Sequence, residues 1–249
     1  MENLDLSYLQ PFGPGILSGV LPRTILDNFM GLSEEVIEKR ITKWNYQLVG
    51  RIDDEWKIPE LLYKDYGVDV FLDELVSKYV DCFIDEWKQI EGFKDIEMPD
   101  LDKDVLRGDG WINYMKEAEY NPIHMHTHCS ISTIFYLNDY HGDEDIVDKT
   151  HPDIEIEKYS DDGHTTFVGG STPFGPAESG VTRLKKLGLH LASFSPRSHF
   201  TVKPKTGLFF IFPAWLLHSV SPFRGKEKRV SASVNYGVRI RGAKKRKKV

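Results

Sequence analysis

Hydrophobic positions recur at helical spacing in the first third of the chain and at strand spacing in the second half. Two helical stretches are expected near the N-terminus, one starting after Pro22 and one starting at Ser33. A longer helix is expected from about residue 68 to 92, where apolar residues form a broad stripe. We expect these apolar stripes to pack in the protein core.

From about residue 109 the pattern changes to short apolar or alternating runs. The expected strands are residues 111–115, 130–137, 165–169, 189–194, 207–212 and 229–240. No helical pattern separates these runs, which favours an antiparallel sandwich or barrel over a Rossmann-like sheet. Residues 139–200 are rich in Gly, Pro, Asp and Ser, so much of this region is expected to form long loops.

The composition is that of a soluble globular protein, with 40% hydrophobic and 28% charged residues in 249. Two cysteines, Cys82 and Cys129, are too few for a disulfide framework or a cysteine zinc site. A metal would therefore be bound by histidine or carboxylate. The sequence contains no apolar run of about 18 residues and no signal-peptide pattern, so we expect no membrane span and a cytoplasmic location.

The net charge of −6 hides an uneven distribution. Residues 239–249 carry seven Lys or Arg and no acid, which leaves 25 basic and 38 acidic residues elsewhere, a net charge of −13. The acidic body would repel phosphate backbones. The basic run 244–248 fits a solvated chain end, and it also fits a nuclear-import signal or a nucleic-acid contact. No pattern selects an oligomeric state, and a homodimer stays open.

Three histidines stand two residues apart in the run NPIHMHTH, at positions 124, 126 and 128. Residues two apart on a strand share a face, at about 3.3 Å per residue, so two of these imidazoles can converge on one metal ion. His218, directly after an apolar run, is the candidate third ligand. A His-x-His motif alone is equally consistent with histidines that are only hydrogen-bonded.

A candidate anion site lies close to this motif in the sequence. Arg229 follows His218 by eleven residues, and Ser231 shares its strand face, which gives a fork of donors suited to a carboxylate. Tyr136, ten residues after His126, could donate its phenol to the same anion. Alone, Arg229 would be interpreted as part of a surface ion pair. Together, these residues predict an anion pocket beside a metal.

Residues 121–138 (NPIHMHTHCSISTIFYLN) and 206–235 resemble the iron(II)/2-oxoglutarate-dependent oxygenase superfamily. More narrowly, they resemble the 2-oxoglutarate oxygenases of phages and marine bacteria, which are relatives of the prolyl hydroxylases. The opening PFGPGILSGVLPRTILDNF is also similar.

This resemblance implies an α+β fold with a double-stranded β-helix core, the jelly-roll or cupin-like architecture. The core would span residues 109–242 and include the loop insert 139–200. A helical support region would precede it at residues 1–108, and a basic tail would follow at residues 243–249.

The resemblance also implies a site with Fe(II) and 2-oxoglutarate as cofactors. The iron ligands would be His124, His126 and His218, and the 2-oxoglutarate contacts would be Arg229, Ser231, Tyr136 and Tyr114. The implied activity is a dioxygenase reaction, in which decarboxylation of 2-oxoglutarate to succinate is coupled to hydroxylation of an unknown substrate. A peptidyl side chain, a nucleobase and a small metabolite all remain open as substrates, with O2 as the co-substrate.

One position departs from the superfamily pattern. Most members carry Asp or Glu where this chain has His126, so a three-histidine site has one more positive charge. A second register, with His126 and His128 as ligands, and a carboxylate from Asp139 or Asp143 are alternatives. The chain could also be a cupin-type three-histidine metalloprotein that does not use 2-oxoglutarate, or a jelly-roll binding protein without catalysis.

Overall fold

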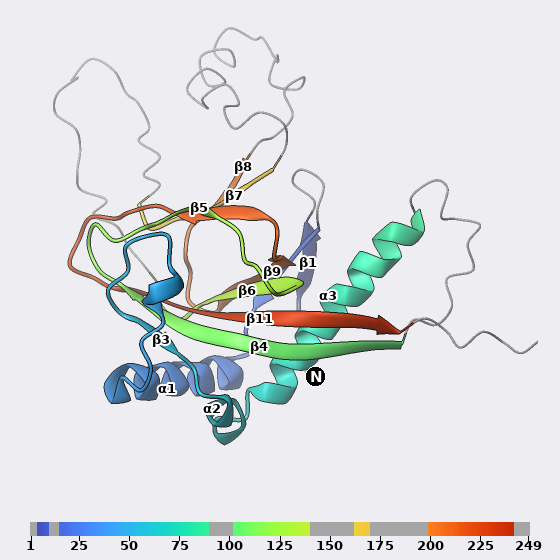
Figure 1. Cartoon of the computed structure of the whole chain (residues 1–249), viewed down its shortest axis with the longest axis horizontal. Coiled ribbons are helices and arrows are strands. Elements are labelled where there is room, and N and C mark those ends of the chain that lie inside the picture. The colour runs from blue at the N-terminus through green and yellow to red at the C-terminus, as the bar shows by residue number, and fades with distance from the viewer. Residues whose placement is uncertain (1–3, 10–14, 90–101, 140–161, 170–198, 242–249) are drawn as a thin grey trace, which may run out of the picture.

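A computed structural model describes residues 4–9, 15–89, 102–139, 162–169 and 199–241 of the chain (Figure 1). The helices are α1 (Arg23–Lys39), α2 (Glu60–Asp65) and α3 (Asp69–Gln89), with a 3-10 turn at Asn45–Gln47. The strands are β1 (Leu6–Leu9), β2 (Ile16–Val20), β3 (Glu55–Lys57), β4 (Asp102–Met115), β5 (Asn121–His124), β6 (Ile131–Tyr136), β7 (Thr165–Val168), β8 (His199–Val202), β9 (Leu208–Pro213), β10 (Leu217–Val220) and β11 (Arg229–Arg241).

The strands form two antiparallel sheets. The larger sheet has the order β1-β2-β9-β6-β11-β4-β3, and the smaller has the order β5-β10-β7-β8. From β4 onward the first strand pairs with the last, so that β4 pairs with β11, β5 with β10, β6 with β9 and β7 with β8. This nested pairing across two sheets is the jelly-roll topology. The expected α+β fold with a double-stranded β-helix core is confirmed.

Two apolar clusters occupy the two faces of the larger sheet. On the outer face the three helices cover the sheet, as in the contact between Phe29 of α1 and Phe135 of β6, whose rings are 5.2 Å apart. On the inner face, between the sheets, lies a second cluster that includes Tyr136, Phe167 and Phe212. Successive residues of a strand point to opposite faces. Whether a residue occupies an odd or an even position along its strand therefore decides whether its side chain reaches the interior of the jelly roll.

Several local expectations change in the structure. The two helical stretches expected after Pro22 and from Ser33 form the single helix α1, because the Ser33 hydroxyl donates to the Met30 carbonyl (2.8 Å) and does not interrupt the helix. The boundary expected at residue 109 falls inside β4, and the preceding region adds β1, β2 and β3 to the larger sheet. Within the expected loop insert, β7 confirms the strand expected at 165–169, and the start of β8 is a strand that was not expected. The strand expected at 189–194 and the basic tail at 243–249 lie outside the described residues.

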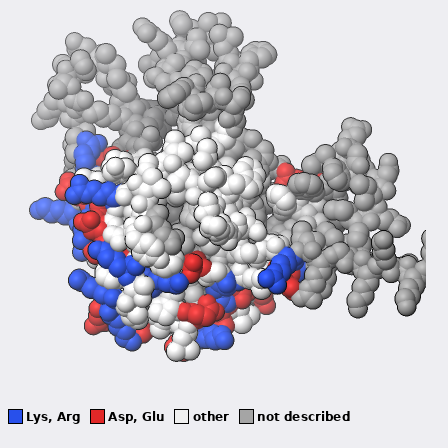
Figure 2. All heavy atoms as spheres, in the orientation of Figure 1, with Lys and Arg blue, Asp and Glu red and all other residues white. Residues whose placement is uncertain are grey.

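Charge is unevenly distributed over the face shown in Figure 2. There, the charged side chains of the described residues gather at the lower and left parts, around α1, α2 and β3. Exposed hydrophobic side chains also occur on and beside β5 and β10; these are Ile123, Met125, Trp215 and Leu217. Within the described part of the chain, no helix combines the length and the apolar character needed to cross a membrane.

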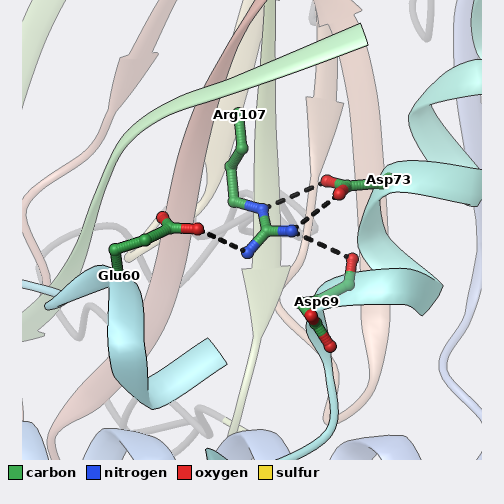
Figure 3. Close-up of polar contacts among 4 residues, drawn as sticks. All are labelled: Glu60, Asp69, Asp73 and Arg107. Atoms are coloured by element: carbon green, nitrogen blue, oxygen red, sulfur yellow. Dashed lines mark hydrogen bonds and ion pairs between the residues drawn. The ribbon is translucent and has the colours of Figure 1, made fainter. Parts of the chain in front are cut away.

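Arg107 ties the helices to strand β4 (Figure 3). Its guanidinium donates to both carboxylate oxygens of Asp73 (3.1 and 2.7 Å) and to the Asp69 carbonyl, and it lies 3.4 Å from a carboxylate oxygen of Glu60. It also stacks over the Tyr63 ring, 4.8 Å from the centroid. The Arg107 side chain is only 8% exposed, whereas its carboxylate partners Asp73 and Glu60 are 41% and 64% exposed, so the network lies at the protein surface.

We expect Arg107→Ala to lower the free energy of unfolding by about 2 kcal/mol, since it removes charge-assisted hydrogen bonds and a cation–π contact. Urea denaturation measures this loss. Arg23→Ala is the control, because the Arg23 and Asp27 side chains are 82% and 50% exposed and such a pair contributes little. Equal losses in the two variants would contradict the interpretation.

Candidate functional site

Three histidines meet at the adjoining ends of β5 and β10. His124 and His218 are register partners in these antiparallel strands. The chain then passes to His126, whose backbone N–H donates to the Ala214 carbonyl (2.9 Å). One ring nitrogen from each histidine lies within 4.8 Å of the others. The structure therefore brings together the three predicted metal ligands.

The ring orientations suit a metal ion. The Nδ1 atom of His124 lies 2.7 Å from the Pro122 carbonyl, and that of His218 lies 2.9 Å from the Leu216 carbonyl. A carbonyl only accepts, so each Nδ1 carries the proton and each Nε2 keeps a lone pair for a ligand bond. The Nε2 atoms of His126 and His218 are 3.1 Å apart. Two nitrogens bound at right angles to one ion, each at about 2.1 Å, would be about 3 Å apart.

Burial keeps these imidazoles neutral, as metal binding requires. Desolvation lowers the pKa of His124, lowers that of His126 to about 3, and holds the pKa of His218 well below its ordinary value. The neighbouring histidines add to the effect on His126 and His218. The donor set, three neutral imidazoles, is one that divalent transition metals accept.

The alternative ligands lie elsewhere. His128 is exposed and has a φ of 61°, and it is not part of the three-histidine cluster. Asp139 accepts a hydrogen bond from the Thr206 backbone N–H and is also outside the cluster. Asp143 lies outside the described residues. Of the two candidate ligand pairs, the structure brings His124 and His126 together with His218, and not His126 and His128.

Arg229 lies in the interior of the jelly roll, at 1% exposure. Its guanidinium donates to the Gly163 carbonyl (2.9 Å), to Thr165 Oγ1 (3.0 Å) and to Ser231 Oγ (3.2 Å). It also lies over the Tyr136 ring, 5.2 Å from the centroid, and the Tyr136 hydroxyl donates to Thr165 Oγ1 (2.8 Å). The predicted trio of Arg229, Ser231 and Tyr136 is thus assembled, with Thr165 joining two of its members.

The guanidinium of Arg229 has no carboxylate partner among the described residues. Desolvation lowers its pKa, and Tyr136 opposes this only in part. A buried cation without a counter-charge is costly, so the site suits an anionic ligand. One cavity is lined by the three histidines and by Arg229 and Ser231. A ligand with a carboxylate at one end could therefore reach the metal position with its other end.

A comparison with protein families agrees with this geometry. The model of the family described as "Putative 2OG-Fe(II) oxygenase" matches residues 109–235, which is 127 of the 249 residues. The chain belongs to this family. Its cofactors are therefore Fe(II) and 2-oxoglutarate (2OG), and the donor set above fits both. No curated protein matches this oxygenase.

Solved structures with similar folds include a prolyl-4-hydroxylase from Pseudomonas putida, at 10% identity and a TM-score of 0.42, with 94% of this chain and 93% of that chain covered. AviO1 from Streptomyces viridochromogenes Tue57 matches at 14% identity and a TM-score of 0.47, with 90% of each chain covered. A prolyl hydroxylase from Trichoplax adhaerens, solved with a peptide fragment of hypoxia inducible factor, matches at 10% identity and a TM-score of 0.46, with 93% and 83% covered.

Two predicted 2OG contacts, Tyr114 and Tyr136, do not line the cavity of this oxygenase. Tyr136 is linked to the cavity through its hydrogen bond to Thr165, which does line it. On β4 the cavity is lined by Trp111, Asn113 and Met115, whereas Tyr114 points to the opposite face and lies under Lys228, 4.5 Å from Nζ to the ring centroid. The expectation that Tyr114 contacts the cosubstrate came from the family resemblance, which does not fix which face of β4 a residue occupies. The structure places Asn113 and Met115, and not Tyr114, at the cavity.

Sequence reasoning also missed Thr165 and Trp111. The alternation in WINYM could have indicated Trp111, Asn113 and Met115 as one face of a strand. Nothing in the sequence around Thr165 pointed to Arg229, which is 64 residues away. Only the pairing of β7 with β10 brings Thr165 to the site.

The depressed histidine pKa values predict an acid-sensitive metal-free protein. Unfolded histidines take up protons below about pH 6.5, whereas the folded ones resist protonation. The free energy of unfolding should therefore fall as pH drops below about 6.5, by up to about 1.4 kcal/mol per pH unit for each histidine. Urea denaturation between pH 7 and 5 measures the slope. His126→Gln removes one of the protons taken up on unfolding, so it should reduce the slope by up to about 1.4 kcal/mol per pH unit. An unchanged slope would contradict the prediction.

Proposed function

We propose that this oxygenase is a hydroxylase, which converts a substrate C–H group, O2 and 2OG into an alcohol, succinate and CO2. His124, His126 and His218 would hold Fe(II), and Arg229 would bind the distal carboxylate of 2OG. The observation that carries the proposal is the buried, uncompensated guanidinium of Arg229 in the cavity that the histidines line. Fe(II) and 2OG together supply the oxidising chemistry, and the chain supplies binding and orientation.

The protein groups divide into two sets by what they bind. The three imidazoles stay neutral because of burial, so they can donate lone pairs without first losing protons. At the other end, Arg229 and Ser231 offer N–H and O–H donors to a carboxylate, and Thr165 holds both Arg229 and Tyr136 in place. Between the sheets, the apolar cluster that includes Phe167 and Phe212 packs against His218, with ring centroids 6.1 and 4.9 Å away.

The direct test is succinate formation. Protein loaded with Fe(II) is incubated in air with isotopically labelled 2OG, alone and with a prolyl peptide, an oligonucleotide or a mixture of small metabolites. Labelled succinate that depends on Fe(II) and increases with one substrate class would support the proposal and identify that class. Tight iron binding with no succinate under any condition would instead favour a three-histidine metalloprotein that does not use 2OG.

Thr165→Val should weaken 2OG binding without affecting the metal. The substitution keeps the shape of the side chain but removes the hydroxyl that Arg229 and Tyr136 share. We expect the KM for 2OG to rise about tenfold, or about 1.4 kcal/mol, which is the size of one hydrogen bond to a charged group. Steady-state kinetics measures this rise, with Thr201→Val on β8 as the control, since Thr201 bonds Thr166 and not Arg229. A change in kcat alone would contradict this assignment.

A further inference from the structure

His126 is covered by Trp111, a tryptophan of strand β4. The Trp111 ring stacks on His126 with centroids 5.5 Å apart and planes 20° apart. The rings of His126 and His218 are nearly parallel, with planes 2° and centroids 5.0 Å apart, and they meet edge to edge with their Nε2 atoms 3.1 Å apart. Within the described residues no hydrogen bond to His126 Nδ1 is found, unlike the two other histidines. The orientation of His126 therefore depends on these ring contacts.

Trp111 is itself held by a hydrogen-bonded chain that ends at a carboxylate. Trp111 Nε1 donates to Asn113 Oδ1 (3.2 Å), and Asn113 Nδ2 donates to Glu55 Oε2 (2.8 Å), with the amide in the orientation that satisfies both contacts. Glu55 and Asn113 are register partners on β3 and β4, so their side chains share the inner face of the sheet. The chain thus runs from Glu55 to the ring that covers His126.

Glu55 is buried without a compensating charge. It is 3% exposed, and within the described residues no ion pair includes it. The nearby lysines pair elsewhere, Lys57 with Asp109 and Lys116 with Asp54. Desolvation raises the pKa of Glu55 to about 7. An ionised Glu55 would be stabilised by a divalent cation at the three histidines, and by reciprocity it would strengthen the binding of that cation.

We propose that Glu55 is a positioning residue that acts through Asn113 and Trp111 on His126 and supplies the negative charge that a three-histidine site lacks. Sites with two histidines and one carboxylate carry that charge on a ligand. In this chain His126 occupies the ligand position, and the carboxylate lies two hydrogen bonds behind the ring that covers it. The inference rests on the proposed metal site and adds to it a source of charge outside the ligand set.

The test is the affinity of the metal-free protein for Co(II) and Ni(II), measured at pH 8 by competition with a chelator, so that no turnover is needed. Glu55→Gln keeps the size of the side chain and an acceptor for Asn113, and it removes only the charge. We expect affinity to fall about tenfold, at the lower end of the effect of groups that support metal ligands. Asp73→Asn is the matched control, since it removes one charge from the opposite, helix-covered side of the sheet and should change affinity less than twofold.

A double variant that moves the negative charge from residue 55 to residue 113 distinguishes an effect of charge from an effect of side-chain shape. In Glu55→Gln with Asn113→Asp, the amide of residue 55 can donate to the new carboxylate, which still accepts from Trp111 Nε1, so the negative charge moves one step along the same chain. We expect affinity to return to within threefold of wild type. Unchanged affinity in Glu55→Gln would overturn the proposal, and so would a loss that the double variant does not restore. If the wild-type protein binds neither metal, the metal site itself is wrong, which is a separate failure.

Discussion

Arg229→Met is expected to lower the affinity for 2OG at least a hundredfold and to leave Fe(II) affinity unchanged. A buried guanidinium that binds a carboxylate through charge-assisted hydrogen bonds contributes about 3–5 kcal/mol when the partner would otherwise be left unpaired. That energy corresponds to a factor of about a hundred to several thousand. Methionine fills most of the same volume and buries no charge, so the protein without ligand should not be destabilised.

An anaerobic titration measures this effect. Fe(II) and then 2OG are added to metal-free protein, and the visible metal-to-ligand charge-transfer band reports the ternary complex. Arg229→Lys is the matched control, since it keeps the charge but loses the planar fork that reaches Thr165 and Ser231. Its affinity for 2OG should lie between those of wild type and Arg229→Met. Parallel loss of Fe(II) and 2OG binding in Arg229→Met would contradict the separation of the two sites.

His218→Ala should lower Fe(II) affinity by more than a hundredfold. The substitution removes one of three ligands and leaves the Nε2 atoms of His124 and His126 without the partner that completes the cluster. Each metal–imidazole bond contributes several kcal/mol to site affinity, on the order of a third of the total free energy of such sites. Calorimetric titration with Fe(II) under anaerobic conditions, or with Ni(II) in air, measures this loss.

His128→Ala is the control for this measurement. It removes a histidine from the same sequence motif that is exposed and outside the cluster, and Fe(II) affinity should stay within twofold of wild type. Thermal unfolding of both variants checks that the fold is kept, since His218 packs against Phe212 with centroids 4.9 Å apart. If His128→Ala were the variant that loses the metal, the register that pairs His126 with His128 would be correct.

The two variants together separate the two ends of the site. Arg229→Met should bind metal and fail to bind 2OG, whereas His218→Ala should bind neither in the productive mode, because the keto end of 2OG then lacks its anchor. This asymmetry follows from the geometry, in which one cavity is lined by both groups but the groups share no side chain. A pure fold defect would affect both ligands equally in both variants.

Much of the site was predictable from local patterns. Arg229 and Ser231 are two apart on β11, so the period of a β-strand fixes this pair. The His-x-His spacing also selected two residues that meet, but β5 ends at His124, and His126 is held by its backbone hydrogen bond to Ala214. Strands β4, β6, β7, β9 and β11 also follow from their hydrophobic runs. By contrast, β1, β2, β3, β5, β8 and β10 were not predicted, because short strands carry little periodicity of their own and form by pairing with neighbours.

The sequence by itself indicated an antiparallel β fold and the candidate residues for a metal and an anion, because these depend on residue types at short spacing. The resemblance to the 2OG oxygenases added the jelly-roll core and the choice of His124 and His126 over His126 and His128. Only the tertiary structure decided which face of β4 lines the cavity, and it replaced Tyr114 with Asn113 there. It also brought Thr165 to Arg229 and Glu55 to Asn113, across 64 and 58 residues of chain. Strand register is set by long-range pairing, and a slip of one residue turns every side chain to the other face, so local patterns could not decide these contacts.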